Sequence, residues 1–488
     1  MSELNELARG VIVAGIRGSA LDPAMPKFGA YVLFNDDGAP VERMRALSDA
    51  LRARQEDSPT IAIDQEGGVV ARLREGVETM PPMMALGAAG DLNLTRRAGE
   101  QLAFDLRRAG CTLDFAPVLD LALDPRNTVI GTRSFGSDPQ RVAALGKSLA
   151  DGLMAGGITP CFKHFPGHGS TATDSHEALP VVDCSEVELR ERDLVPFATV
   201  AAQAPAMMNA HVVARALDSE HPATLSARIA TGLLREELGF RGTLFTDSLE
   251  MGALAGVQDA DVAVAALAAG ADMLVFSHRV ERALRAADAI VEAVSDGRLP
   301  LVRLQEAYAR AQSLRKAGSA PLPLDEFPPH PNLGREIARS AITLVRGIAH
   351  ADPVFSIAVS FGGETTLVRE APVLAHVALS LDPAPDEVER LFAELERRKR
   401  RPLVLSRRAH LHPLQAAAIA RILTGYPDAI VVSLREPFDL PLFGAARHLL
   451  AAYGDDPASL GGLADVLFSG HMPAGRLPIV SLQRDVAF

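Results

Sequence analysis

The sequence predicts an α/β protein in which a (β/α)8 TIM barrel is followed by a smaller, open α/β domain resembling a three-layer sandwich. Two observations lead to this prediction. Eight short, almost continuously apolar segments recur within the first 280 of the 488 residues, as is typical of strands that are covered on both faces. Amphipathic helical patterns occupy most of the gaps between these segments, and this alternation favours a parallel barrel over an antiparallel sandwich.

The elements of the predicted barrel follow one another along residues 1–317. The eight strands begin at positions 11, 31, 60, 112, 159, 206, 242 and 271. Helical periodicity predicts helices at 41–53, 96–109, 140–155, 185–201, 227–238 and 260–269. Two further helical patterns, at 280–294 and 302–317, would close the outer ring of helices.

A proline-rich stretch at 318–334 has neither helical nor strand periodicity and predicts a semi-rigid linker. After it, apolar β-rich segments at 341–345, 354–360, 373–379, 402–406 and 429–434 predict strands. Helical patterns at 386–400 and 413–425 alternate with these strands. Together they predict a second α/β domain over 335–488.

Composition narrows the classes of function. The net charge of -12 argues against nucleic acid or an anionic membrane surface as the main partner. Three cysteines, Cys111, Cys161 and Cys184, are too few for a disulfide framework or a cysteine-rich zinc site. The N-terminus has acidic residues before any apolar segment and no basic region, which predicts neither a signal peptide nor a membrane span. We therefore expect a cytoplasmic protein.

Polar residues stand at the carboxyl ends of several predicted strands, where a barrel of this kind carries its active site. A packing layer would use Val, Ile or Leu there. The sequence instead has charged or polar residues, which predicts a catalytic mouth: Asp64, Asp120, Lys163, His164, His211 and Asp247.

The segment after the fifth strand, 163–176, contains three histidines and an aspartate. Pro166 and Gly167 exclude a continuous helix, so we expect a loop. A metal site is one interpretation. However, His164 and His168 cannot lie one turn apart on a helix, and no His-X-His pair ends a barrel strand. The pair at 410–412 lies in the second domain and is interpreted as a surface loop. We expect neither metal nor cofactor.

An acid–base pair is the other interpretation of this loop. Asp174 and His176 are two residues apart, and an aspartate beside an imidazole can orient the ring and favour its protonated form. Asp247 ends the seventh strand and is the candidate for a carboxylate nucleophile. A structural role for Asp247 as a helix cap is the alternative.

Four motifs together resemble glycoside hydrolase family 3: DQEGG at 64–68, KHFPGHG…TDSH at 163–176, AHV at 210–212 and FTDSLEM at 245–251. Within that family the similarity is to the bacterial β-N-acetylglucosaminidases that act on recycled cell-wall fragments. The KHFPGHG…DSH loop distinguishes this subgroup from the β-glucosidase and β-xylosidase members, which take their acid from another domain. The tail from Leu463 resembles the end of the family's second domain. The whole chain is therefore similar to the two-domain members of this subgroup.

The resemblance implies a retaining, exo-acting mechanism with Asp247 as nucleophile, His176 as acid/base and Asp174 as the partner that orients His176. It also implies that five residues bind the hydroxyls of the terminal sugar: Asp64, Arg72, Arg133, Lys163 and His164. Charged donors and a carboxylate suit a polyol, although structural ion pairs are the alternative. Where the family often reads DQEGGRV, Val69 takes the Arg position, which leaves the contact of that arginine in doubt.

The sequence thus predicts a hydrolase that removes terminal β-linked N-acetylglucosamine (GlcNAc) from small carbohydrates, either muropeptide or chitin-type fragments. One alternative is a phosphorylase, because a histidine repels phosphate less than a glutamate would. Others are a β-glucosidase of the same family and a non-catalytic sugar-binding barrel, against which the intact Asp174, His176 and Asp247 argue. All of these residues precede Gly318, so we expect no catalytic residue from Arg335 onward.

Overall fold

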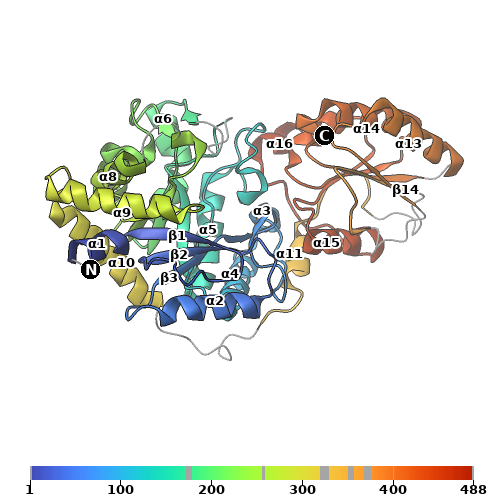
Figure 1. Ribbon diagram of the computed structural model, residues 1–488. Coiled ribbons are helices and arrows are strands. Elements are labelled where there is room, and N and C mark those ends of the chain that lie inside the picture. The colour runs from blue at the N-terminus through green and yellow to red at the C-terminus, as the bar shows by residue number, and fades with distance from the viewer. Residues whose placement is uncertain are drawn as a thin grey trace.

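The computed structural model of the protein describes residues 3–171, 179–254, 259–318, 329–349, 357–367, 375–398 and 401–485. Figure 1 shows two bodies side by side, one coloured blue to yellow with the N-terminus and one coloured orange to red with the C-terminus. Within the described ranges, no helix has the length and apolar character needed to cross a bilayer.

The first body is a closed barrel of eight parallel strands, as predicted. Their order around the barrel is β1-β12-β11-β9-β7-β6-β3-β2. The strands are β1 (Ile12–Arg17), β2 (Ala30–Phe34), β3 (Thr60–Ile63), β6 (Leu113–Asp114), β7 (Thr159–Phe165), β9 (Ala206–Asn209), β11 (Thr243–Ser248) and β12 (Met273–Phe276). Short two-stranded sheets accompany them at the ends: β4 (Gln65–Gly67) with β5 (Val70–Ala71), and β8 (Val181–Val182) with β10 (Val213–Ala214).

The barrel strands are apolar throughout because the side chains on both of their faces are buried. Val13, Val32 and Phe245 belong to a cluster that fills the barrel interior. Their neighbours Ile12 and Leu244 point the other way and pack in the large cluster under the helices. Both faces of each strand are therefore buried, and no polar alternation appears in the sequence.

Helices form the outer ring of the barrel (Figure 1): α1 (Glu3–Gly10), α2 (Val41–Ala53), α3 (Met83–Ala89), α4 (Leu92–Arg108), α5 (Pro139–Ala155), α6 (Glu186–Glu188), α7 (Val195–Val200), η4 (Arg228–Glu237), α8 (Asp259–Ala269), α9 (Val280–Ser295) and α10 (Leu301–Gly318). The side chains of Asp91 and Asp138 accept hydrogen bonds from amides in the first turns of α4 and α5. These caps explain where both helices begin.

The single helix predicted at 185–201 is interrupted. A π-helical turn, η2 (Leu189–Asp193), separates α6 from α7. Pro196 stands in the first turn of α7 and has no amide hydrogen to donate to the preceding turn, so a regular helix cannot run through this point.

The second body contains a six-stranded sheet with the order β13-β18-β17-β16-β14-β15. Its strands are β13 (Thr343–Arg346), β14 (Ile357–Phe361), β15 (His376–Leu379), β16 (Pro402–Ser406), β17 (Ile430–Ser433) and β18 (His448–Ala451). All pairs are parallel except β13 with β18. The sequence did not predict β18, a segment of only four residues.

Helices cover both faces of this sheet, which makes the three layers that were predicted. They are α11 (Leu333–Ala341), α13 (Pro385–Arg398), α14 (Pro413–Gly425), α15 (Pro457–Phe468) and α16 (Val480–Asp485). Val404 packs in the same cluster as Ile419 of α14, whereas its neighbour Leu405 packs with Leu463 of α15. The sequence did not predict α15, because a helix buried on nearly all sides lacks an amphipathic pattern.

Candidate active site

A cavity of about 430 Å³ opens at the carboxyl ends of the barrel strands. Six of the residues predicted to act in catalysis or sugar binding line it together: Asp64, Arg72, Arg133, Lys163, His164 and Asp247. The other two, Asp174 and His176, lie outside the described residues. All described residues on the cavity wall precede position 279.

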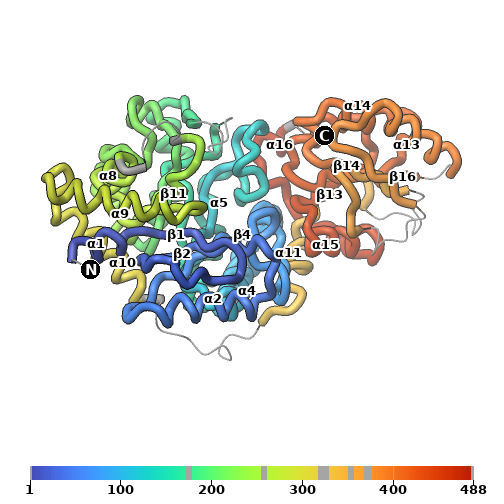
Figure 2. The backbone as a smooth tube through the Cα atoms, viewed as in Figure 1, coloured from blue at the N-terminus to red at the C-terminus, as the bar shows by residue number. Residues whose placement is uncertain are grey.

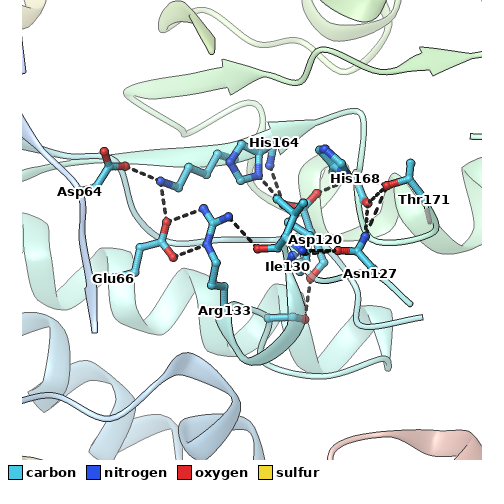
Figure 3. A network of polar contacts seen from close by, with 12 residues as sticks. Asp64, Glu66, Asp120, Asn127, Ile130, Arg133, His164, His168 and Thr171 are labelled. Carbon is cyan, nitrogen blue, oxygen red and sulfur yellow. Dashed lines mark hydrogen bonds and ion pairs between the residues drawn. The ribbon is translucent and has the colours of Figure 1, made fainter. Parts of the chain in front are cut away.

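One side of the cavity is built around Lys163, whose ammonium lies 2.7 Å from Asp64 Oδ1 and 2.7 Å from Glu66 Oε1. The guanidinium of Arg133 grips the same glutamate, with Nε 2.7 Å from Oε2 and Nη2 2.7 Å from Oε1 (Figure 3). Two carboxylates and two cations thus alternate in one chain of contacts, which fixes each long side chain against its neighbours.

Glu66 is the hidden member of this network. Its side chain is only 1% exposed, and it does not line the cavity. Burial by itself raises the pKa of Glu66, but the charges of Arg133 and Lys163 outweigh burial and lower the pKa to about 2. The carboxylates of Asp64 and Glu66 raise the pKa of Lys163, although burial by itself would lower it. Lys163 and Arg133 are therefore charged donors at neutral pH.

Replacing Glu66 with glutamine should lower the free energy of unfolding by about 3 kcal/mol, because two buried cations lose their shared counter-charge. Chemical denaturation at pH 7 measures this loss. Since Glu66 in the folded protein stays ionised down to about pH 2, its contribution is present above about pH 4.5 and is lost as the pH falls from there towards 2. The difference between the variant and the wild type should shrink over that range.

The control for this experiment is Glu389→Gln, which removes the carboxylate of an exposed ion pair with Arg421. It should leave the free energy of unfolding nearly unchanged. If both variants lost the same free energy of unfolding, the contribution of Glu66 to stability would not depend on its burial.

His164 is oriented from outside the cavity by Asp120. Burial raises the pKa of Asp120, but the adjacent His164 charge and hydrogen bonds lower it below its ordinary value. The ionised carboxylate can only accept, so His164 Nδ1, 2.6 Å from Asp120 Oδ2, carries the hydrogen. The backbone amides of His164 and His168 also donate to Asp120. One aspartate thus holds the end of β7 and the first residues of the loop that follows it.

His168 lines the cavity beside His164 but was not assigned a role from the sequence. The Thr171 hydroxyl donates to the carbonyl of His168, so it accepts from His168 Nδ1 at 2.8 Å. Burial lowers the pKa of His168, which favours the neutral ring. Its Nε2 is then a bare acceptor, buried and without a hydrogen-bond partner among the described residues. It can accept a hydrogen bond from a ligand in the cavity.

Asp247 lies near the end of β11, which only β9 separates from β7 around the barrel, and it lines the same cavity. Its Oδ1 accepts a hydrogen bond of 2.7 Å from the amide of Ser248. Burial raises the pKa of Asp247, but the positive charges of His164 and His211, together with that amide, hold the pKa below its ordinary value. His211 Nε2 in turn lies 2.9 Å from the Ser248 carbonyl oxygen. Asp247 is therefore an oriented, ionised carboxylate at neutral pH.

Irregularities in two strands bring neighbouring residues to the same cavity. In a regular strand, successive side chains point to opposite faces. The register between β7 and β9 shifts between Lys163 and Phe165, and both Lys163 and His164 reach the cavity. A similar shift after Phe245 lets Asp247 and Ser248 face it together. Such irregularities are common beside active sites, where they redirect side chains.

The rim contains Arg72, whose guanidinium carbon lies 5.0 Å from the ring centre of Phe34. Arg72 Nη2 is 4.0 Å from Asp64 Oδ2, so it adds positive charge to the same network. Val69 also lines the cavity and is 40% exposed. At the position where the resemblance leads us to expect an arginine, the rim is therefore apolar.

The DQEGG turn needs its two glycines. Gly67 and Gly68 have φ values of +95° and +57°. A Cβ on Gly67 would lie 2.6 Å from the Pro81 carbonyl oxygen, and one on Gly68 would lie 2.4 Å from Cγ of Pro82. Only glycine allows this turn to pack so closely, with Asp64 and Glu66 leading into it.

His410 and His412 were predicted to lie in a surface loop, and His410 contacts the barrel. His410 Nε2 lies 3.0 Å from the carbonyl oxygen of Pro125, and His412 Nδ1 lies 2.6 Å from Asp382 within the second domain. Both side chains are partly exposed, and His410 lies in the short 3-10 turn η7 (Ala409–Leu411) at the contact with the barrel domain.

Comparison with known proteins identifies the family. The model for the glycosyl hydrolase family 3 N-terminal domain matches residues 23–314. A β-hexosaminidase of Chromobacterium violaceum is 41% identical over 294 residues, which cover 57% of this chain and 81% of that protein. A β-hexosaminidase of Pseudomonas aeruginosa is 41% identical over 250 residues, which cover 51% of this chain and 74% of that protein.

A solved structure extends the likeness to both domains. The glycoside hydrolase family 3 β-N-acetylglucosaminidase from Paenibacillus sp. str. FPU-7 matches with a TM-score of 0.89 and 31% identity, covering 98% of this chain and 99% of that chain. The fold predicted for both domains is confirmed by this match. On the barrel, its motifs and these similarities, the chain belongs to glycosyl hydrolase family 3 and is a glycoside hydrolase.

Proposed function

We propose that the protein is a retaining, exo-acting β-N-acetylglucosaminidase that forms a covalent glycosyl ester on Asp247. The observation that carries this proposal is the oriented carboxylate of Asp247, which stays ionised facing a cavity lined by charged hydrogen-bond donors. The similar β-hexosaminidases and the Paenibacillus β-N-acetylglucosaminidase support GlcNAc as the sugar released.

In the first step, a carboxylate oxygen of Asp247 attacks the anomeric carbon and the bond to the leaving oxygen breaks. The leaving oxygen takes a proton from His176, whose ring Asp174 orients in this proposal. In the second step the neutral imidazole removes a proton from water, and the hydroxide oxygen displaces Asp247 from the anomeric carbon. The proton balance closes, because His176 ends each cycle protonated.

Asp64, Arg72, Arg133, Lys163 and His164 bind the hydroxyls of the terminal sugar in this proposal. Ion pairs and hydrogen bonds already fix the side chains of Lys163, Arg133 and His164, so they need little reordering when a sugar binds. The apolar side chains of Phe115, Met208 and Val275 from the barrel interior also line the cavity. A closed floor of this kind suits the end of a sugar chain better than its middle.

We further propose that the natural substrates are muropeptide or chitin-type fragments and that the protein acts in the cytoplasm, for example in peptidoglycan recycling. The net charge of -12 and three free thiols are compatible with that compartment. We also propose domain boundaries at 1–317 and 335–488, with a linker at 318–334. The end of α10 at Gly318 supports the first boundary, and α11 begins at Leu333.

A panel of nitrophenyl β-glycosides, assayed with and without phosphate, tests this function. We expect the N-acetylglucosaminide to react fastest and to yield free GlcNAc whether or not phosphate is added. Formation of a sugar 1-phosphate would instead identify a phosphorylase, and a faster reaction of the glucoside would identify a β-glucosidase. A protein that binds GlcNAc but cleaves none of the substrates would be a sugar-binding barrel.

A further inference from the structure

The segment from Pro125 to Ser137 follows β6 and brings Val129 and Arg133 to the cavity. In Figure 2 this cyan part of the chain lies next to the red tube of the second domain, near α16. Hydrogen bonds join the segment to the second domain along its length. The Pro125 carbonyl contacts His410, and the Ser137 amide donates to the Pro478 carbonyl at 3.0 Å. The segment thus lines the cavity on one side and contacts the second domain on the other.

Glu436 is the buried charge in the middle of this contact. Its side chain is 4% exposed and is held bidentately by Arg408, with Nε 2.8 Å from Oε2 and Nη2 2.7 Å from Oε1. The same Oε1 accepts a hydrogen bond of 3.3 Å from the backbone amide of Thr132 in the barrel domain. A carboxylate of the second domain therefore binds the backbone of the first.

The turn that Glu436 binds is shaped for this approach. It is the 3-10 turn η1 (Gly131–Arg133). Gly131 has a φ of +45°, and a Cβ at this position would lie 2.1 Å from Glu436 Oε1. Any side chain here would push the carboxylate away, so the close approach depends on glycine.

Arg133 ends the same turn. Its Nη1 donates to the Val129 carbonyl at 3.0 Å, while Nε and Nη2 bind Glu66. The guanidinium is held in the cavity wall by these bonds, and its backbone is held from the other side through Thr132. A shift of the turn would therefore move Arg133 relative to a bound sugar.

We propose that Glu436 is a positioning residue for the reaction: the second domain uses it to hold the turn at 131–133 and so to aim Arg133 at the terminal sugar. The proposal rests on the sugar-binding role proposed for Arg133. Glu436 itself does not line the cavity, and Arg408 contacts both of its oxygens, so it acts through Arg133 and not as a proton donor.

Glu436→Ala in the full-length protein tests this role, with Glu336→Ala, which removes a more exposed ion pair between the domains, as the control. Glu336 also pairs bidentately with an arginine across the domain contact, Arg97 of α4, but lies away from the cavity wall. On the nitrophenyl glycoside that the wild type cleaves fastest, Glu436→Ala should lower kcat/KM about 10- to 50-fold, mainly through KM. Glu336→Ala should leave kcat/KM within about twofold of the wild type.

A double variant separates positioning from general stability. If Glu436 acts through Arg133, Glu436→Ala combined with Arg133→Ala should be no slower than Arg133→Ala alone. Glu436→Gln keeps an acceptor for the Thr132 amide and should recover part of the loss. If the losses in kcat/KM of the two single variants multiply in the double variant, the proposal is overturned. It is also overturned if Glu436→Ala and Glu336→Ala lose kcat/KM equally.

Kinetics of Gly131→Ala and a crystal structure of Glu436→Ala provide two further tests. If Glu436→Ala does not fold, Gly131→Ala displaces the turn from the barrel side without removing a charge, and it should raise KM in the same way. An unchanged KM in a folded Gly131→Ala protein would contradict the role. If the wild type cleaves no glycoside, the proposed function fails. The positioning role is then judged in a crystal structure of Glu436→Ala, in which the turn at 131–133 should have moved.

Discussion

Replacing Asp247 with asparagine should reduce hydrolysis of a nitrophenyl β-N-acetylglucosaminide by roughly 10⁴-fold or more while the protein stays folded. An amide cannot form the glycosyl ester that the proposed mechanism requires. The asparagine oxygen can still accept the hydrogen bond from the Ser248 amide that now holds Asp247 Oδ1, so the end of β11 should keep its shape. Steady-state kinetics and a thermal melt measure the two effects separately.

Trapping the intermediate identifies the nucleophile directly. A fluorinated slow substrate should add one sugar to the intact mass of the wild type, and digestion should place the sugar on the peptide that contains Asp247. Asp247→Asn is the control and should remain unlabelled. A label on Asp174 or on Asp120 would show that the nucleophile has been assigned to the wrong carboxylate.

Replacing His176 with alanine should slow glycosylation by substrates with poor leaving groups about 10²- to 10⁴-fold. A sugar or an alkyl alcohol needs a proton as it departs, and the unperturbed pKa of histidine, about 6.5, suits proton transfer near neutrality. Dinitrophenol departs without a proton, so its release should change much less. Pre-steady-state measurements on both classes of substrate isolate this step.

Two further variants test the acid/base role of His176. Asp174→Asn should show the same dependence on the leaving group, but more weakly, because the ring remains. His221→Ala is the control: this histidine is exposed and pairs with Asp218 away from the cavity, so both rates should stay at the wild-type level. If His176→Ala slows both classes of substrate equally at glycosylation, the proton comes from another group.

Most of the barrel could be predicted because its strands and helices follow local patterns. Continuous apolar segments mark strands buried on both faces, and Asp91 and Asp138 mark helix starts by capping them. The second domain was less predictable at its end. The strand β18 was not predicted, although other four-residue strands such as β17 were, and α15 is buried on nearly all sides and shows no amphipathic face.

The motifs also identified which residues meet at the cavity, but not how they are held. Glu66 lies within the quoted DQEGG motif and was not singled out, although two cations, Lys163 and Arg133, need a counter-charge. That need was the signal that could have identified it. The free acceptor on His168 depends on Thr171 and on burial, and no spacing along the chain reveals either.

The sequence by itself therefore determined the class of fold, the order of the barrel strands along the chain and the set of side chains at their carboxyl ends. Those features depend on patterns only a few residues long, because backbone geometry repeats over such distances. The tertiary structure alone decided which of these groups are ionised, which way they face and that Glu436 binds the turn of Arg133. Charge and burial are set by neighbours that lie far apart in the chain, such as Thr132 and Glu436, which are 304 positions apart, and local patterns do not record them.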